Sequence, residues 1–126
     1  MKHIVFLVAL LTACLSTWAQ EQKHKTPIDT AQINYVELVK YNGSKAASFP
    51  RKQLSKTQYA DFAKVWNLSK KIGTDKYKMS YYVYVHLKNG KTRQFTIAAN
   101  KIQEQDWMTF DITDKTYFDK LWEAAK

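Results

Sequence analysis

Few side chains in this chain of 126 residues combine the type and spacing that catalysis needs. The strongest candidate for acid–base chemistry is His86, which lies in an aromatic-rich stretch. As a general base it would need a nucleophile on one side and an acid that orients its ring on the other. No serine lies in a nucleophile elbow or another serine-hydrolase motif. We therefore expect His86 to be a half-exposed strand residue, and we identify no catalytic residue.

Metal, phosphate and glycosidic chemistry have equally little support. A zinc site needs three or four ligands, and no spacing of His, Cys, Asp and Glu supplies them. Gly43, Gly73 and Gly90 are isolated, so no phosphate-binding loop is predicted. Asp111 and Asp114 are an acidic pair of the kind that can flank a glycosidic bond, but helix capping explains the second and solvation the first. We predict no metal and no cofactor.

Positive charge is concentrated in the middle of the chain, whose formal net charge is +9. Residues 40–93 contain 13 Lys or Arg and two acids, whereas residues 94–126 have a net charge of −2. Such asymmetry attracts anionic partners. The predicted partner is an anionic envelope component or an acidic protein. The predicted basic surface comprises Arg51, Lys52, Lys70, Lys71, Lys76 and Lys78.

Nucleic acid is not expected to be a specific partner. Beyond residue 19 the chain has 17 lysines and only two arginines. Specific recognition of bases and phosphates relies on the two-pronged hydrogen bonding of the arginine guanidinium, which lysine does not offer. The lysine-rich composition therefore favours a less geometrically specific attraction.

The first 19 residues have the layout of a secretory signal peptide. A short basic start, residues 1–3, precedes the apolar run Ile4–Leu11, which is too short to span a bilayer. Thr17-Trp18-Ala19 then offers a cleavage pattern. We expect an exported protein, periplasmic or secreted, cleaved after Ala19.

Cys14 leaves a second processing route open. Leu11-Thr12-Ala13-Cys14 resembles the lipobox of bacterial lipoproteins, in which the cysteine is lipidated and becomes the first residue. The protein would then be anchored to the envelope through Cys14, its only expected contact with a membrane. Cleavage after Ala19 is the preferred interpretation, and it would leave a chain without cysteine.

The remaining chain is predicted to be a tether over residues 20–31 and a single domain over residues 32–126. The tether lacks hydrophobic periodicity and contains Pro27. The domain begins with a strand over 33–41 and a return strand over 45–49 that stops at Pro50. Imperfect alternation in the first strand would be explained by a β-bulge or by burial of both faces.

A helix follows, and its start is well marked. Ser55 and Gln58 form a capping box, while Leu54 and Tyr59 match a hydrophobic staple. Apolar residues then recur with helical spacing at Tyr59, Phe62, Ala63 and Trp66. Residues 69–77 are predicted to be a basic loop.

A β-hairpin is predicted over residues 79–99. Only a three-residue loop, 88–90, pairs Val83 with Phe95 and so keeps the apolar residues of both strands on one face. Tyrosine side chains are apolar in the ring and polar at the tip, which suits an interface. The opposite face is the predicted partner-binding surface, and it carries Tyr82, Tyr84, His86, Gln94 and Thr96.

The chain ends with a strand near 106–112 and a helix capped by Thr113. The apolar stripe of that helix comprises Tyr117, Phe118, Leu121, Trp122 and Ala125. The order is ββαβββα, which predicts an α+β fold. An antiparallel sheet of four to five strands would carry two amphipathic helices on one face.

The leader and this order of elements resemble small exported proteins of Bacteroidetes-type bacteria, including lipoproteins, of unknown function. The resemblance implies no functional residues. The leading hypothesis is a non-enzymatic binding or inhibitory module of the bacterial envelope, acting through the basic surface and the exposed aromatic face. One alternative is a small envelope hydrolase without a recognisable motif, and another is a structural protein anchored at Cys14.

Overall fold

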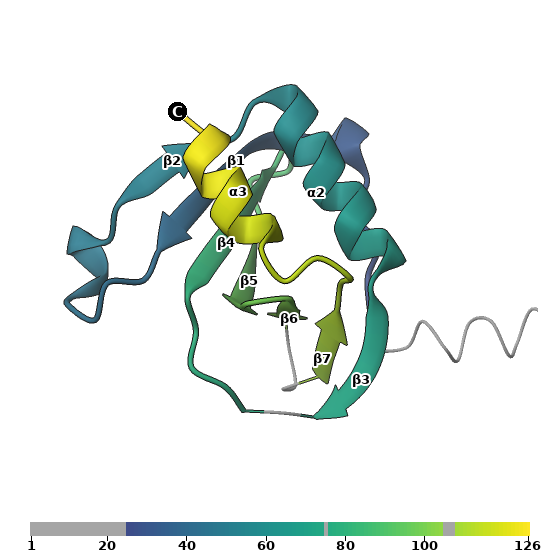
Figure 1. Ribbon diagram of the computed structural model, residues 1–126. Helices are drawn as coiled ribbons and strands as arrows, with labels where there is room; N and C mark the ends of the chain where they lie inside the picture. Colours follow the sequence, from purple (N-terminus) through teal and green to yellow (C-terminus); the bar gives the residue numbers. More distant parts are fainter. Residues whose placement is uncertain (1–24, 75, 105–107) are drawn as a thin grey trace, which may run out of the picture.

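The computed structural model describes residues 25–74, 76–104 and 108–126. The predicted signal peptide with Cys14, and residues 20–24 of the predicted tether, lie outside these ranges. The described chain forms an α+β domain with one antiparallel sheet and two α-helices (Figure 1). The α+β class is confirmed, whereas the prediction of four to five strands was too low, because the sheet has seven.

The strands follow the order β2-β1-β4-β5-β6-β7-β3 across the sheet, and all neighbours are antiparallel. The strands are β1 (Ile33–Lys40), β2 (Arg51–Gln53), β3 (Lys70–Thr74), β4 (Tyr81–Leu87), β5 (Thr92–Ala98), β6 (Lys101–Gln103) and β7 (Met108–Asp111). The α-helices are α2 (Lys56–Leu68) and α3 (Tyr117–Ala124), and two short 3-10 helices are η1 (Thr30–Gln32) and η2 (Ala46–Ser48).

Helices α2 and α3 lie side by side over one face of the sheet, called here the inner face (Figure 1). Phe62 of α2 contacts Phe95 of β5 and Phe118 of α3 edge-on, at ring-centroid distances of 5.5 and 6.1 Å. Trp66 meets Phe95 and Phe110 in the same way. The predicted helical stripes therefore supply the core, as the sequence indicated.

The local chemistry predicted for α2 and for the hairpin is confirmed. Ser55 caps α2. Its hydroxyl oxygen accepts from the Gln58 backbone N–H, and the Gln58 side-chain oxygen accepts from the Ser55 backbone N–H. In the hairpin, Val83 pairs with Phe95, and Leu87 N–H donates to the Lys91 carbonyl across a three-residue loop. Gly90 has φ of 87°, a conformation that glycine adopts at little cost.

Two strands were missed, each for a physical reason. Lys70–Thr74, expected to be a loop, is the edge strand β3, where both rows of side chains reach solvent and no apolar alternation is needed. Strand β6 follows β5 through a two-residue turn, Ala99-Asn100, in which Ala99 has φ of 53°. Such turns are normally marked by glycine, and none is present here.

Two element boundaries also need correction. Residues 45–49 were expected to be a return strand, but 46–48 form η2 and the strand β2 comes after Pro50, whose carbonyl accepts from Lys40 N–H. Helix α3 starts after Thr116, not Thr113. Asp114 accepts hydrogen bonds from the backbone N–H and the hydroxyl of Thr116, so this aspartate forms a turn before the helix.

Residues 25–31, expected to belong to a tether, pack against α2 instead. Ile28 is buried in the core, and its backbone N–H and carbonyl both bond the side chain of Asn67. The Lys25 ammonium donates to the carbonyls of Asn67 and Ser69 at the end of α2, and burial lowers its pKa. Within the described ranges, neither helix is long and apolar enough to cross a membrane.

Candidate functional site

The face of the sheet away from the helices carries a row of aromatic rings, called here the aromatic row. It comprises Tyr35, Tyr41, Phe49, Tyr82, Tyr84 and His86, all of them partly exposed. Tyr82, Tyr84 and His86 come from β4, where they alternate with residues of the core. Tyr35 comes from β1, and Tyr41 and Phe49 come from the loop that joins β1 to β2.

Ring-to-ring contacts connect one end of this row. Tyr82 stacks on Tyr84 with a centroid distance of 6.1 Å, and Phe49 stacks on Tyr82 at 6.1 Å. Tyr41 meets Phe49 edge-on at 5.3 Å. The Tyr82 hydroxyl contacts the sulfur of Met79. Burial raises the pKa of Tyr82, and the neighbouring Tyr84 and Tyr41 contribute to the shift.

One buried residue lies on the same face of the sheet as the aromatic row. Val39 lies on the outer face opposite Tyr82 and Arg51, yet it is fully buried and is not a member of the inner core. The β1–β2 loop therefore folds partly over the hairpin, with Phe49 as the covering ring. Rings that pack on one another have less freedom to move than isolated exposed tyrosines would have.

His86 is held at the other end of the row by three contacts. Its ring stacks on Tyr35 with centroids 4.0 Å apart and planes 12° from parallel. Its Nε2 lies 2.8 Å from Glu37 Oε1, and its Nδ1 lies 3.1 Å from Thr92 Oγ1. All four side chains project from adjacent strands, because Tyr35 is paired with His86, and His86 with Thr92.

Arg51 links the two ends. A guanidinium nitrogen lies 3.7 Å from Glu37 Oε2, and the guanidinium carbon lies 5.6 Å from the centre of the Tyr84 ring. Its side chain is 47% exposed, so the charge stays accessible to a partner. Beside the aromatic row the outer face thus offers the Arg51 cation and the Glu37 carboxylate.

Gln94 and Thr96 extend the face onto β5, as predicted. They pair with Tyr84 and Tyr82 respectively, Gln94 is exposed, and Thr96 is partly buried. The structure therefore places all five residues of the predicted partner surface on one face. Sequence reasoning missed Tyr35, Glu37 and Phe49, whose place depends on pairing between β1 and β4 and on the path of the β1–β2 loop.

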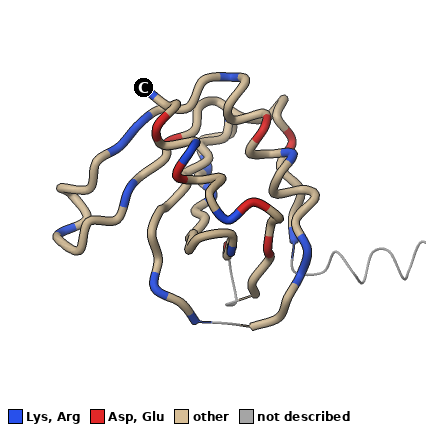
Figure 2. Tube along the Cα trace, in the orientation of Figure 1, with Lys and Arg blue, Asp and Glu red and all other residues tan. Residues whose placement is uncertain are grey.

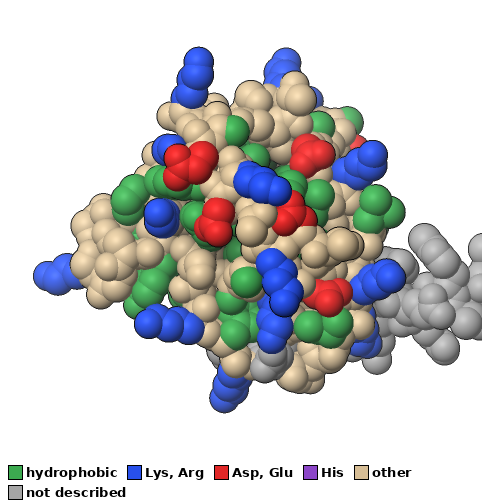
Figure 3. All heavy atoms as spheres, viewed as in Figure 1, with side chains coloured by type: hydrophobic (Ala, Val, Ile, Leu, Met, Phe, Trp, Pro, Cys, Tyr) green, Lys and Arg blue, Asp and Glu red, His purple; other side chains and the backbone are tan. Residues whose placement is uncertain are grey.

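The predicted basic surface is not one continuous patch. Arg51 and Lys52 lie on β2, whereas Lys70 and Lys71 lie on β3, and these two strands are the opposite edges of the sheet (Figure 1). Figure 2 shows Lys and Arg distributed around the fold, and Figure 3 shows acidic side chains between them on the helix-bearing side. Lys76 and Lys78 are exposed in the segment before β4.

Lys52 has a structural use that the sequence did not indicate. Its ammonium donates to the Trp122 carbonyl at 2.7 Å and lies 4.4 Å from the centre of the Trp122 ring. Strand β2 alternates, so Lys52 faces α3 while Arg51 faces the aromatic row. Of these two predicted basic residues, only Arg51 belongs to the candidate site.

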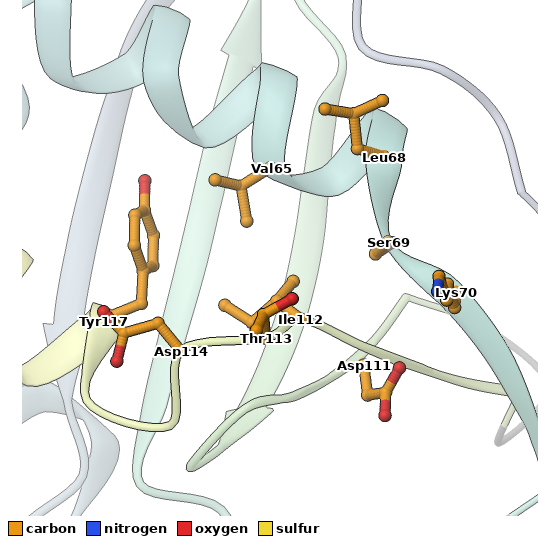
Figure 4. Close-up of a pocket in the computed structure, with 9 residues that line it drawn as sticks. All are labelled: Val65, Leu68, Ser69, Lys70, Asp111, Ile112, Thr113, Asp114 and Tyr117. Carbon is orange, nitrogen blue, oxygen red and sulfur yellow. The ribbon is translucent and has the colours of Figure 1, made fainter.

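A hollow of about 420 Å³ lies at the other end of the molecule, between the end of α2 and the connection from β7 to α3 (Figure 4). Figure 4 shows Lys70 and Asp111 at one end of it and Asp114 and Tyr117 at the other. Its lining residues are Val65, Leu68, Ser69, Lys70, Asp111, Ile112, Thr113, Asp114 and Tyr117.

The acidic pair of this hollow is explained by local structure at Asp114. Hydrogen bonds from Thr116 and Lys120 hold the pKa of Asp114 below its ordinary value, so it is a poor proton donor. Tyr117 donates to Asp61, and burial together with this bond raises its pKa. No cluster of three metal-ligating side chains occurs in the described part of the chain.

Comparison with known proteins adds no relative. No protein-family model matches the chain, and searches of curated proteins and of solved structures find no match. The functional argument therefore depends on the residues of this chain alone.

Proposed function

We propose that this protein is a non-enzymatic binding module that acts outside the cytoplasm and holds an acidic protein on its aromatic row. The observation that carries the proposal is the row itself: six partly exposed rings in two stacked groups, with Arg51 against Tyr84. Rings that are already in place lose little conformational freedom on binding, which favours affinity.

The composition of this face favours a protein over an anionic glycolipid or polymer. Tyrosine and arginine are the residue types that most often dominate the energy of protein interfaces. A repeating polyanion would be better matched by a row of cations, whereas Arg51 is the cation that contacts the aromatic row. The net charge of +9 favours encounter with an acidic partner.

The test is capture with matched variants. Tyr82→Ala with Tyr84→Ala removes the centre of the row, and Ala60→Ser changes an exposed residue of α2 as the control. We expect the double variant to lose a partner that both the wild-type protein and the control retain from envelope extract. The retained protein is then purified, and its Kd for each variant is measured directly. Equal Kd values for the wild type and the double variant would overturn the proposal.

A second candidate function, an envelope hydrolase, is favoured by one specific geometry. Thr92, His86 and Glu37 stand in the order of a nucleophile, a general base and an orienting acid, at 3.1 and 2.8 Å. Turnover of p-nitrophenyl acetate tests it. Thr92→Ala and His86→Asn should each remove all activity above background, with Tyr84→Phe as the control. Unchanged turnover in the first two variants would exclude this trio.

Export is part of the proposal. The mature protein should begin at Gln20 or, if the lipobox operates, at a lipid-modified Cys14. The N-terminal peptide and the intact mass of the natively expressed protein distinguish these two ends. Recovery of mature protein that still contains residues 1–19 would contradict export by this leader. A lipid-modified Cys14 would favour the anchored form.

A further inference from the structure

Strand β3 is an edge strand with unusual surroundings. Among the described strands it pairs only with β7, so its other side presents backbone N–H and carbonyl groups to solvent. Four of its five residues are exposed. An edge of this kind is the template that an added strand uses in peptide recognition.

Exposed apolar side chains mark the same place. Leu68 is 71% exposed and Ile72 is 48% exposed, and both are large hydrophobic residues. They lie four residues apart across the junction of α2 and β3. Leu68 also lines the hollow shown in Figure 4. A single exposed leucine needs no explanation, but two beside an open edge and a hollow form a coherent surface.

We propose that the outer edge of β3 binds an extended segment of an acidic protein by strand addition, with an apolar side chain of that segment placed in the hollow beside Leu68. Backbone hydrogen bonds to β3 supply the affinity, and the hollow supplies the selectivity. This surface is separate from the aromatic row, because β3 lies at the far edge of the sheet from β2 and β1.

The lysines of β3 decide which occupant fits. Lys70 and Lys71 are both exposed, and each would face a side chain of the added strand. A second copy of this chain paired antiparallel along the whole of β3 would place Lys70 opposite Thr74 and Lys71 opposite Gly73, so it would offer neither lysine a carboxylate. A segment with Asp or Glu at alternate positions would instead place its carboxylates on one face of the added strand, where they can pair with Lys70.

The hollow offers apolar lining to a side chain of such a segment. Val65, Leu68 and Ile112 contribute its apolar lining, and the last lies in the connection after β7. Lys70 and Asp111, which are paired across β3 and β7, form its polar end. Where an apolar residue of the segment is next to an acidic one, the apolar side chain would therefore contact the apolar lining and the acidic side chain would contact Lys70.

The experiment uses the full mature protein and synthetic capped hexapeptides. The test peptide alternates glutamate with valine, and a matched peptide alternates lysine with valine. A third peptide has the test sequence with N-methyl groups on alternate residues, which removes hydrogen-bond donors. Titration followed by amide hydrogen exchange reports both the Kd and the location. We expect only the test peptide to bind and to slow the exchange of amides in 70–74.

Variants make the result specific. Lys70→Glu and Ile72→Ser should each weaken binding by about tenfold, which corresponds to about 1.4 kcal/mol. Lys91→Glu, an exposed residue at the hairpin loop, should leave the Kd unchanged, as should the Tyr82→Ala, Tyr84→Ala variant. The last control separates this proposal from the function of the aromatic row.

Four results of the peptide titrations would overturn the proposal. These are equal binding of the lysine peptide, equal binding of the N-methylated peptide, protection that appears outside β3, and no binding of the test peptide. Protection of the outward β3 amides before any peptide is added would show that the edge is already occupied, either by another part of this chain or by a second copy. Sedimentation velocity then distinguishes those two occupants, and either one rejects an acidic partner at this edge.

Discussion

The two faces of the β4–β5 hairpin show how one pair of strands can serve two purposes. On the inner face, Val83, Val85, Phe95 and Ile97 are fully buried beneath the helices. On the outer face, the rings of β4 remain half-exposed and are held by one another and by polar neighbours. Because successive residues alternate between the faces, a substitution on one side can leave the other intact. Stability and recognition are therefore separable in this domain.

The largest effect is expected on the inner face. Phe62→Ala should lower the free energy of unfolding by about 3–5 kcal/mol, because it empties a site closed by Phe95 and Phe118. Urea denaturation of the variant and the wild type measures the difference. A loss below about 1 kcal/mol, the scale of surface substitutions, would show that α2 does not pack as described.

The paired change on the outer face should cost less. Tyr82→Ala with Tyr84→Ala uncovers Val39 but leaves the helix-covered core untouched. We expect a loss of about 1–2 kcal/mol, within the common range for single substitutions. Urea denaturation again provides the measurement. A cost equal to that of Phe62→Ala would mean that the outer rings are a second core and not an available surface.

Alkaline pH should weaken the contact between the helices and the sheet. Burial, with hydrogen bonds to Asp119 and Asp61, raises the pKa of Tyr81 and Tyr117 above that in the unfolded chain. Their stabilising contribution is complete below the unfolded value of about 10 and declines as the pH rises above it. The unfolding free energy should therefore fall from pH 9 to pH 11.

Phenylalanine variants identify the residues responsible. Tyr117→Phe should make the loss of stability above pH 10 shallower, because it removes one group that ionises more readily when unfolded. Tyr59→Phe, on the α2 surface beside the core, is the matched control. Parallel pH profiles for the wild type and Tyr117→Phe would contradict this account.

The smallest effect on stability is expected at Arg51. Its 3.7 Å contact with Glu37 is half-exposed, and such pairs contribute about 0–1 kcal/mol. Arg51→Ala should therefore leave the melting temperature almost unchanged while it weakens binding of the captured partner. Thermal denaturation and the partner Kd, measured on the same preparation, test both halves. A large loss of stability with unchanged Kd would reverse the assignment of Arg51 to the partner surface.

The parts of the fold that were predictable are those set by local chemistry. Ser55 and Gln58 lie three residues apart and define the start of α2 from side-chain bonding alone. The hairpin register followed from alternation, because a one-residue slip would have exposed Val83 and Phe95. A bulge or burial of both faces was offered to explain the alternation of β1, and a register shift is present between Ile33 and Tyr35.

The parts that were missed depend on long-range pairing. Strand β3 is exposed and lysine-rich, and only its bonding to β7 makes it a strand. The contact between Glu37 and His86 joins residues 49 positions apart. Nothing in the local sequence of Tyr35 or Phe49 distinguishes an outer-face ring from a core residue. Composition likewise could not reveal that Arg51 and Lys70 lie at opposite edges.

The segment Lys25–Ile28 has a mechanical consequence. Tension applied to the chain on the N-terminal side of Lys25 would act on several hydrogen bonds at once. Asn67 bonds Ile28, the Trp66 indole donates to the Thr26 carbonyl, and Arg93 donates to the carbonyls of Thr26 and Pro27. These anchors stand on α2 and β5, so the load would be divided between a helix and the sheet. If the protein is attached at its N-terminal side, the domain would therefore have little freedom to rotate about Ile28. The aromatic row would therefore keep its orientation relative to Lys25–Ile28.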